Sequence, residues 1–500
     1  MTNRSVTSLG IDLGTSSVKV LILDPGEGVI GTASAGYELY TSHFGWVEQD
    51  PHEWWQSTLC ALNGLREKHP AAYGVIRAVS LSGQLNGAVF VDGGSRCLRN
   101  VPIWLDHRAE AECAMIDAGL ASRLRERTLS TVTPVNTLAK LLWMRDHEPE
   151  IYDNAAKVLL PKDWIRLQLT GSLGTDFSDA SVTAALDLSE RTWAFDLIEE
   201  LGLRPPLFPD LSESTAVVGE ILPEVAAETG LAAGTPVCAG GGDMPCMAVG
   251  SGVVEPGIVG LGIGTAAHAI AYTEELDARA VGALWPLCHP HPGGYAWLGC
   301  SYTGGASLRW LRDIFSYDSF RELCTEAEGV APGSEGLFFA PWLEGTATPS
   351  PDASARGAYI GLTLRHERGH LIRALMEGVA FDLRQSLECF LAIELSVSTP
   401  LRFGEGGSRS ALWCQIVADV MGRDLQIIET EDLSAVGAAL IAAVGVGQVA
   451  DFAMGAEIAI VMGDRVEVDP DRCKLYDEAF QRYRDLYPRL QNWFITPVKS

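Results

Sequence analysis

The chain has 500 residues, which is too long for one hydrophobic core and predicts two domains. Its net charge of −27 argues against nucleic acid and anionic membranes as partners, while 47% hydrophobic and 20% charged residues are typical of a globular protein. Eleven cysteines without a Cys-x-x-Cys pair, and an N-terminus without a signal-peptide core, predict reduced thiols in a cytoplasmic protein.

The first predicted elements are two apolar strands, residues 6–13 and 18–23, joined by a polar turn. Gly14 in this turn can adopt φ > 0 and allows a ligand to approach the backbone. Small residues that leave backbone N–H groups accessible to phosphate follow it: Thr15, Ser16 and Ser17. Asp12 ends the first strand, and a carboxylate beside phosphate requires a cation such as Mg²⁺ between them. The turn therefore predicts a phosphate site with Asp12 as its metal-binding residue.

The next elements complete the pattern of one lobe. A third strand is expected at residues 29–37, and Asp50 and Pro51 then have the cap and first-turn residues of a helix. A further strand at residues 76–80 leads into a polar loop at residues 81–87. Three strands, a helix and another strand, in this order, match a ribonuclease H-like lobe.

Two polar stretches in the first half have alternative interpretations. Trp104 and Asp106 follow a proline, and their segment is either a pocket wall or a helix start capped by Asp106. Residues 176–188 contain aspartates and serines that could line a sugar pocket, although an ordinary turn is the preferred interpretation.

A second glycine turn, Gly264 and Thr265, lies half a chain length after the turn at Gly14. Gly262 stands where the first copy has Asp12, so the second copy offers a ligand only its backbone. An internal repeat at this spacing predicts two similar lobes with a nucleotide between them.

A loop of three glycines, residues 240–242, lies between the two turns and is followed by Asp243 and Met244. Consecutive glycines suggest that the loop approaches a ligand closely, with one acid at the crossing between the lobes. The boundary predicted from these stretches divides the chain into residues 1–245 and 246–500.

The second half contains a further glycine loop. A helix is expected to begin near Gly305, and the proline- and glycine-rich residues 341–357 are expected at the surface. A strand at residues 401–403 leads through a glycine loop into a helix, an arrangement in which a nucleotide can lie. The central residues of this loop are Gly406, Gly407 and Ser408.

Residues 366–370 read His-Glu-Arg-Gly-His, which formally matches a zinc-binding motif. Gly369 within the motif weakens a helix, and the apolar helical pattern starts only at Leu371. The two histidines are therefore expected in a loop or first turn, and no zinc site is expected here.

Together these stretches, in this order over nearly the whole chain, resemble the FGGY family of carbohydrate kinases. The resemblance implies an α/β fold of two ribonuclease H-like lobes, of the hexokinase–actin type, with an ATP cleft between them. It implies ATP and Mg²⁺ as cofactors, Asp12 as the metal residue and Asp243 as the catalytic base. The implied nucleotide residues are Thr15, Ser16, Ser17, Gly264, Thr265, Gly305, Gly406, Gly407 and Ser408. The implied sugar residues are Gln84, Leu85, Asn86, Trp104, Asp106, Asp243 and Met244.

The resemblance favours a ketose acceptor, D-xylulose, with another ketose, a deoxy-ketose or a polyol as the alternative. Asn86 and Met244 depart from the histidine and asparagine usual in the resembled enzymes, and these departures leave the sugar open. Residues 345–349 also depart from the usual Gly-Glu-Arg-Thr-Pro, and Glu405 replaces a glycine of the adenosine loop. An actin- or chaperone-like ATPase without a sugar substrate is the rival interpretation. A homodimer is compatible with the sequence.

Overall fold

The first half of the chain forms a seven-stranded mixed sheet. The computed structural model describes residues 6–494. The strands of this sheet are β1 (Thr7–Leu13), β2 (Ser17–Asp24), β3 (Gly28–Gly36), β5 (Ile76–Gly83), β13 (Val217–Glu220), β14 (Pro236–Cys238) and β15 (Gly241–Gly242). Their order is β13-β14-β5-β1-β2-β3, and β15 also pairs with β5.

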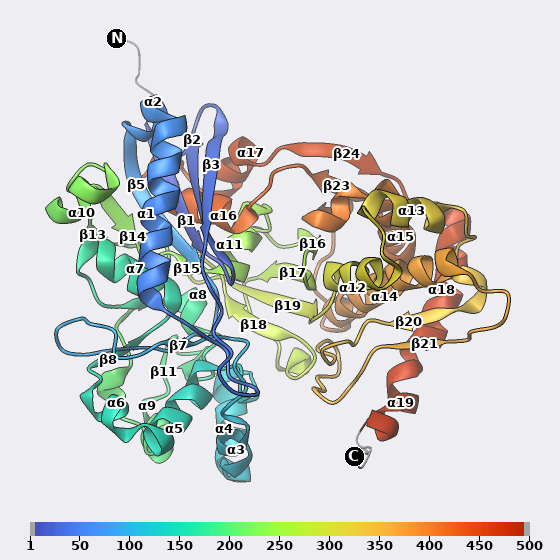
Figure 1. Ribbon diagram of the computed structural model, residues 1–500, viewed down its shortest axis with the longest axis horizontal. Coiled ribbons are helices and arrows are strands. Elements are labelled where there is room, and N and C mark those ends of the chain that lie inside the picture. Colours follow the sequence, from blue (N-terminus) through green and yellow to red (C-terminus); the bar gives the residue numbers. More distant parts are fainter. Residues whose placement is uncertain (1–5, 495–500) are drawn as a thin grey trace.

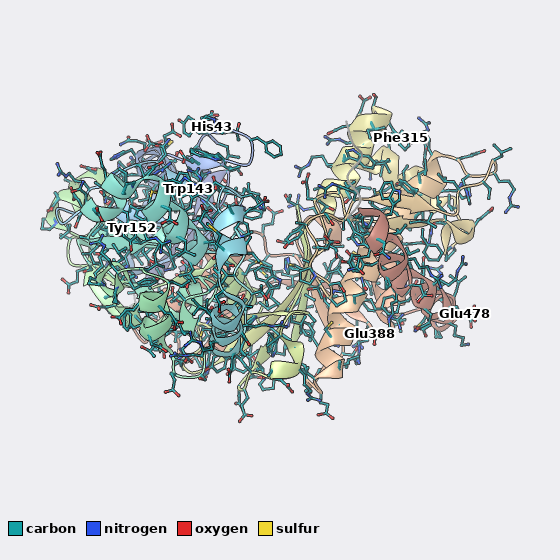
Figure 2. The ribbon with its side chains drawn as sticks, turned by 90° about the horizontal axis from the view of Figure 1, so that it is seen from below. His43, Trp143, Tyr152, Phe315, Glu388 and Glu478 are labelled. Carbon is teal, nitrogen blue, oxygen red and sulfur yellow. The ribbon has the colours of Figure 1, made fainter. Side chains whose placement is uncertain are left out.

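The second half forms another seven-stranded sheet, which lies beside the first in Figure 1. Its strands are β16 (Val259–Ile263), β17 (Ala267–Thr273), β18 (Trp285–Cys288), β19 (Tyr295–Ser301), β22 (Leu401–Gly404), β23 (Leu425–Ile428) and β24 (Met462–Val466). Their order is β18-β19-β17-β16-β22-β23-β24. Figure 2 shows the two lobes from below, with Trp143 and Tyr152 in the first and Glu388 and Glu478 in the second.

The two sheets share one pairing pattern. In each sheet the strand before the glycine turn, β1 or β16, pairs antiparallel with the strand after it, β2 or β17. On its other side it pairs parallel with β5 or β22. The next strand of each sheet is also parallel, because β14 pairs with β5 and β23 pairs with β22. The last strand of each pattern is antiparallel, because β13 pairs with β14 and β24 pairs with β23. This correspondence confirms the predicted fold of two similar ribonuclease H-like lobes.

Helices cover both sheets. In the first half they include α1 (Pro51–Lys68), α3 (Glu110–Met115), α4 (Ala118–Thr128), α5 (Thr137–His147), α7 (Pro161–Thr170), α8 (Phe177–Ala180) and α11 (Asp243–Gly250). In the second half they include α12 (Gly305–Phe315), α13 (Phe320–Glu328), α14 (Arg368–Ala392), α15 (Ala411–Met421), α16 (Leu433–Gly445), α17 (Phe452–Ala459), α18 (Pro470–Arg484) and α19 (Leu486–Phe494). Helix α1 begins as predicted, because Asp50 accepts a 2.8 Å hydrogen bond from the His52 N–H. None of the helices between residues 6 and 494 is long and apolar enough to cross a membrane.

Helix α16 comes from the second half of the chain but packs against β1 and β5 of the first sheet and against α11 (Figure 1). Glycines allow this approach. A Cβ on Gly437 would lie 1.8 Å from the Cys246 carbonyl oxygen, and one on Gly10 would lie 2.1 Å from that of Ala435. The α11–α16 crossing therefore joins the lobes, and the division at residue 245 stays a prediction.

The proline- and glycine-rich residues 341–357 form the predicted surface stretch only in their second part, where Pro351, Ala353 and Arg356 are exposed. Trp342 is 2% exposed and Thr348 is 1% exposed. The Trp342 ring lies 5.7 Å from that of Tyr487 in α19, and Thr348 Oγ1 accepts a hydrogen bond from the Cys300 N–H. The prediction was wrong for the first part of the stretch, because α19 covers Trp342 and β19 binds Thr348.

Candidate active site

Three of the predicted loops leave the same edge of the first sheet. Asp12 in β1 is paired with Ser82 in β5, and Gly242 in β15 is paired with Gly83. These strands are parallel, so their carboxyl ends meet at one edge, the usual place for a ligand in such sheets. Asp12, the loop after Gly83 and Asp243 therefore come together, as predicted.

The Asp12 carboxylate is buried, and its Oδ1 accepts a 2.7 Å hydrogen bond from Ser82 Oγ. Burial raises the pKa of Asp12, against the lowering effects of Ser82 and of the Lys19 charge. Lys19 is opposite Asp12 in the β1–β2 register, and its Nζ lies 2.6 Å from Asp432 Oδ1. The other carboxylate oxygen of Asp12 is free of this hydrogen bond and can bind Mg²⁺, which typically takes its remaining ligands from phosphates and water.

Asp243 is the first residue of α11 and is partly exposed. Its Oδ1 accepts a 2.8 Å hydrogen bond from the Met244 N–H, and its carbonyl accepts one from Ser434 Oγ at 3.1 Å. Although part of the residue reaches solvent, protein surrounds the carboxyl group, and this burial first and the charge of Asp12 second raise the pKa of Asp243 to about 7. A carboxylate with this pKa can take up a proton near neutral pH.

The first glycine turn is tied to the neighbouring sugar-loop residues. Thr15 accepts a 2.6 Å hydrogen bond at its carbonyl from Gln49 Nε2 and a 2.9 Å bond at Oγ1 from Trp104 Nε1. Gln84 Nε2 in turn donates to Gln49 Oε1 at 2.7 Å. Ser16 is exposed at the tip of the turn. Gln49, which precedes helix α1, therefore connects the predicted nucleotide and sugar residues.

The loop after β5 presents two buried carbonyl groups that have no hydrogen-bond partner among residues 6–494: Gln84 Oε1 and Asn86 Oδ1. Asn86 has φ 64°, which turns the loop sharply. Buried polar atoms without a partner in the protein favour a polar ligand or water at this position. Leu85 packs against Gly242, and Leu85 and Met244 both contact a hydrophobic cluster that contains Met247.

Asp106 is fully buried and bound within the protein. Its Oδ2 accepts hydrogen bonds from the Val47 N–H at 2.7 Å and from Arg108 Nη2 at 2.7 Å, and its Oδ1 accepts one from Arg108 Nε at 2.8 Å. The predicted helix cap was wrong, because Ala109 is the N-cap of α3. Sugar binding by Asp106 stays a prediction.

The predicted nucleotide loops of the second lobe also adjoin each other. Gly262 in β16 is paired with Gly404 in β22, so the turn and the loop that follow these strands are neighbours. The Gly305 N–H at the start of α12 donates to the Gly264 carbonyl at 2.8 Å, and the Gly304 N–H donates to that of Thr265 at 2.9 Å. A Cβ on Gly407 would lie 2.6 Å from Ile263, so glycine allows the loop to pack here.

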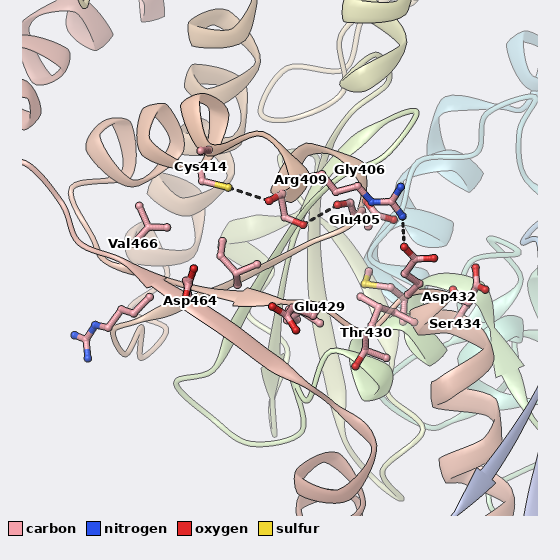
Figure 3. A pocket seen from close by; sticks show the side chains of 18 of the residues that line it. Glu405, Gly406, Arg409, Cys414, Glu429, Thr430, Asp432, Ser434, Asp464 and Val466 are labelled. Atoms are coloured by element: carbon pink, nitrogen blue, oxygen red, sulfur yellow. Dashed lines mark hydrogen bonds and ion pairs between the residues drawn. The ribbon is translucent and has the colours of Figure 1, made fainter. Parts of the chain in front are cut away.

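A cavity of about 1120 Å³ lies between these two groups of loops (Figure 3). Asp12 and Lys19 line it from the first sheet, whereas loops after β22 and β23 and strand β24 line it from the second. Of the predicted nucleotide residues, Gly406 and Ser408 line this cavity. The others do not line it: Thr15, Ser16, Ser17, Gly264, Thr265, Gly305 and Gly407.

Comparison with known proteins identifies the family. The N-terminal domain of the FGGY family of carbohydrate kinases matches residues 7–250, and the C-terminal domain matches residues 261–446. The chain belongs to this family. It is 34% identical to the xylulose kinase of Bacillus subtilis (strain 168) over 493 residues, which cover 98% of each chain. The gluconokinase of the same organism is 28% identical over 452 residues, 87% of this chain and 86% of the relative.

A solved structure agrees with this assignment. The crystal structure described as a xyloylose kinase from Brucella ovis is 33% identical and has a TM-score of 0.90, covering 97% of this chain and 100% of that one. The predictions of a carbohydrate kinase and of the two-lobed fold are therefore confirmed.

The FGGY kinase also contains a buried charge cluster that the sequence did not identify. Lys162 Nζ lies 2.6 Å from Asp163 Oδ1, 2.9 Å from Asp176 Oδ1 and 3.4 Å from Asp179 Oδ2. The cluster adjoins the glycine loop, because the Gly242 N–H donates to Ser178 Oγ at 3.2 Å. Within residues 176–188 the predicted turn is found at residues 181–184, whereas Ser178 in α8 supports the loop before the candidate base.

The His-Glu-Arg-Gly-His segment of this kinase caps a helix. Glu367 is the N-cap of α14, and the His370 ring accepts a 3.1 Å hydrogen bond from the Glu367 N–H. The His366 ring accepts another from the Thr363 N–H at 2.9 Å. Among the described residues, no group of three or more histidine, cysteine, aspartate or glutamate side chains is arranged to hold a metal.

Proposed function

We propose that this FGGY kinase transfers the γ-phosphoryl group of ATP to D-xylulose and forms D-xylulose 5-phosphate, with Mg²⁺ as cofactor. The observation that carries the proposal is the meeting of Asp12, the Gln84–Asn86 loop and Asp243 at neighbouring strand ends. This arrangement can place a metal-facing acid, a polar sugar loop and a base around one reacting centre. Relatives named xylulose kinase support the choice of sugar.

In this proposal Asp243 takes the proton of the attacking sugar hydroxyl. Phosphoryl transfer depends mainly on positioning and on charge stabilisation, because its transition state is loose. The pKa of about 7 makes Asp243 a base of suitable strength near neutral pH. The Ser434 hydroxyl, which donates to the Asp243 carbonyl from α16, fixes the backbone of this residue across the lobe boundary.

Asp12 would hold Mg²⁺ in this proposal, and the ion, when bound, neutralises charge on the phosphates. Backbone groups of Gly264 and Thr265 would bind the phosphates from the second lobe. The cavity lined by Gly406 and Ser408 has the volume required for an adenosine group. Closure of the two lobes would exclude water and suppress hydrolysis.

A second candidate acceptor is another ketose, a deoxy-ketose or a polyol. Asn86 and Met244 favour it, because they replace the pair usual in the resembled enzymes. An ATPase without a sugar substrate is not supported by the family assignment. A homodimer and a cytoplasmic location stay predictions.

The experiment is ADP release from ATP in the presence of a panel of ketoses and polyols. We expect D-xylulose to stimulate release strongly, whereas ATP alone gives only slow hydrolysis. The Asp12→Ala variant should weaken use of Mg·ATP more than it weakens sugar binding, measured by the dependence of rate on Mg²⁺. ADP release that no sugar stimulates would contradict the proposed function, and an unchanged Mg²⁺ dependence would contradict the role of Asp12.

A further inference from the structure

Glu405 has a backbone conformation that is unusual for a residue with a side chain. It lies between β22 and the loop residues Gly406 and Gly407, at a position where the resembled enzymes have glycine. Its φ of 66° and ψ of −162° belong to a region that is populated almost only by glycine. A strained residue at a functional loop suggests that its side chain has a role, because glycine would adopt this backbone without cost.

The Glu405 carboxylate lies directly against the second glycine turn. A Cβ built on Gly264 would be 3.0 Å from Glu405 Oε2 and 3.2 Å from Oε1. Glu405 also lines the cavity, where Figure 3 shows it beside Gly406. Among residues 6–494, the basic group within ion-pair distance of this carboxylate is His268, whose Nδ1 lies 3.8 Å from Oε2.

The cations that line the cavity in the described chain are paired with other acids. Lys19 lies 2.6 Å from Asp432, and Arg465 lies 2.7 Å from Asp424. Arg409 is paired with Glu431. Lys19, the cavity cation that feels the charge of Glu405, is thus already paired, and a phosphate at the Gly264 turn would meet a Glu405 carboxylate that is only partly neutralised. Two like charges at such short range repel each other even in a partly solvated cleft.

We propose that Glu405 makes this cleft selective for the metal-bound nucleotide over the metal-free nucleotide. The inference rests on the proposed function, in which the cavity holds ATP or ADP. The carboxylate disfavours free phosphates on the turn, and a divalent cation carried by the phosphates removes the repulsion. Asp12 faces the cavity from the other lobe, so carboxylates face the nucleotide from both lobes.

The test compares the Kd of ADP measured by calorimetry in excess Mg²⁺ and in EDTA, without sugar or turnover. The Kd in EDTA divided by the Kd in Mg²⁺ gives the selectivity for the metal-bound form. We expect Glu405→Gln, which keeps the size of the side chain but removes its charge, to lower this ratio about tenfold. Glu405→Gly should lower the ratio similarly. Glycine adopts this backbone conformation without strain, so this variant is expected to fold.

Glu429→Gln is the matched control, because it removes the same charge from the same cavity (Figure 3). The Glu429 side chain lies against Gly463 in β24. Strand β24 is three strands from β16, which carries the glycine turn, and three strand spacings are roughly 14 Å. We therefore expect Glu429→Gln to leave the ratio unchanged.

An unchanged ratio in Glu405→Gln, or an equal fall in Glu429→Gln, would overturn the inference while leaving the proposed function intact. Failure of the wild-type protein to bind ADP in either buffer would instead contradict the proposed function, and the inference with it.

Discussion

Two aspartates at the candidate site have different environments, and these environments support different roles. Burial raises the pKa of Asp12, and the hydrogen bond from Ser82 and the charge of Lys19, which lies opposite Asp12, oppose this rise. Burial first, and the charge of Asp12 second, raise the pKa of Asp243 to about 7, although the hydrogen bond from the Met244 N–H opposes this rise. The first carboxylate suits metal binding, and the second suits proton uptake.

Asp243→Asn should abolish phosphoryl transfer and leave nucleotide binding nearly intact. Asparagine keeps the size of the side chain but cannot accept the hydroxyl proton, and loss of a general base typically costs about 10²–10⁴-fold in rate. The measurement is kcat for ADP release with D-xylulose, with calorimetric ADP binding as the control for folding. A variant that keeps more than a tenth of wild-type kcat would remove Asp243 from the base role.

The pH dependence of kcat/KM should report the titration of Asp243. The base acts when deprotonated, so kcat/KM should be level above pH about 7 and fall about tenfold per pH unit below it. The residual activity of Asp243→Asn should lack this acid limb. A wild-type profile that stays level down to pH 5 would contradict the assignment.

At the scale of elements, two helices connect the lobes through glycines. A Cβ on Gly250 in α11 would lie 1.9 Å from the Leu433 carbonyl oxygen, and one on Gly437 in α16 would lie 1.8 Å from that of Cys246. Both contacts involve backbone atoms, which cannot move aside as a flexible side chain can. The α11–α16 crossing therefore fixes Asp243, at the start of α11, relative to both sheets.

Gly437→Ala should destabilise the protein, because its methyl group forces the two helices apart. Overpacking of this kind typically costs about 1–3 kcal/mol, and backbone contacts place it at the upper end. Gly64→Ala in α1 is the matched control, since the nearest atom to its Cβ would be 4.0 Å away. At this position alanine should stabilise the protein by about 0.5–1 kcal/mol, because it has a higher helix propensity than glycine. Denaturant unfolding of both variants is the measurement, and equal effects would contradict the close crossing.

The sequence predicted the elements that depend on local pattern. The strands around Gly14 and Gly264 follow from apolar runs and turn residues, and the repeat of these turns indicated two lobes. Gln49 and Lys162 were missed, because their partners are brought together by the fold and leave no signal at fixed spacing. The burial of Trp342 was missed for the same reason, since the helix that covers it lies more than a hundred residues later.

At the scale of the whole molecule, the candidate site belongs to neither lobe alone. The cavity is lined from both sheets, and the Lys19–Asp432 ion pair and the hydrogen bond from Ser434 to Asp243 cross between the two halves of the chain. The predicted sugar loop follows β5 and lies on the first lobe, and its residues do not line the cavity. We therefore expect a change of acceptor to require changes on the first lobe and at the start of α11.

The acceptor preference should depend on Asn86 and Met244. Methionine offers a sugar hydroxyl no hydrogen-bond donor and only a weak acceptor, and an unpaired buried polar group costs about 1–3 kcal/mol. The wild-type protein should therefore use a deoxy-ketose at least as well as D-xylulose. The side-chain carbonyl of Asn86, which has no hydrogen-bond partner among residues 6–494, keeps one side of the pocket polar. The Asn86→His, Met244→Asn double variant should shift the kcat/KM ratio toward D-xylulose about 5- to 100-fold.

The measurement for this last prediction is kcat/KM for D-xylulose, a deoxy analogue and several other ketoses in both proteins. The single variants serve as controls, since Met244→Asn supplies the missing donor and should account for most of the shift. Met244 also packs against the hydrophobic cluster around Met247, so a thermal unfolding scan must show that the variant is folded. A wild-type protein that prefers D-xylulose tenfold over every other sugar, with the same ranking in the double variant, would contradict the altered pocket and leave an ordinary xylulose kinase.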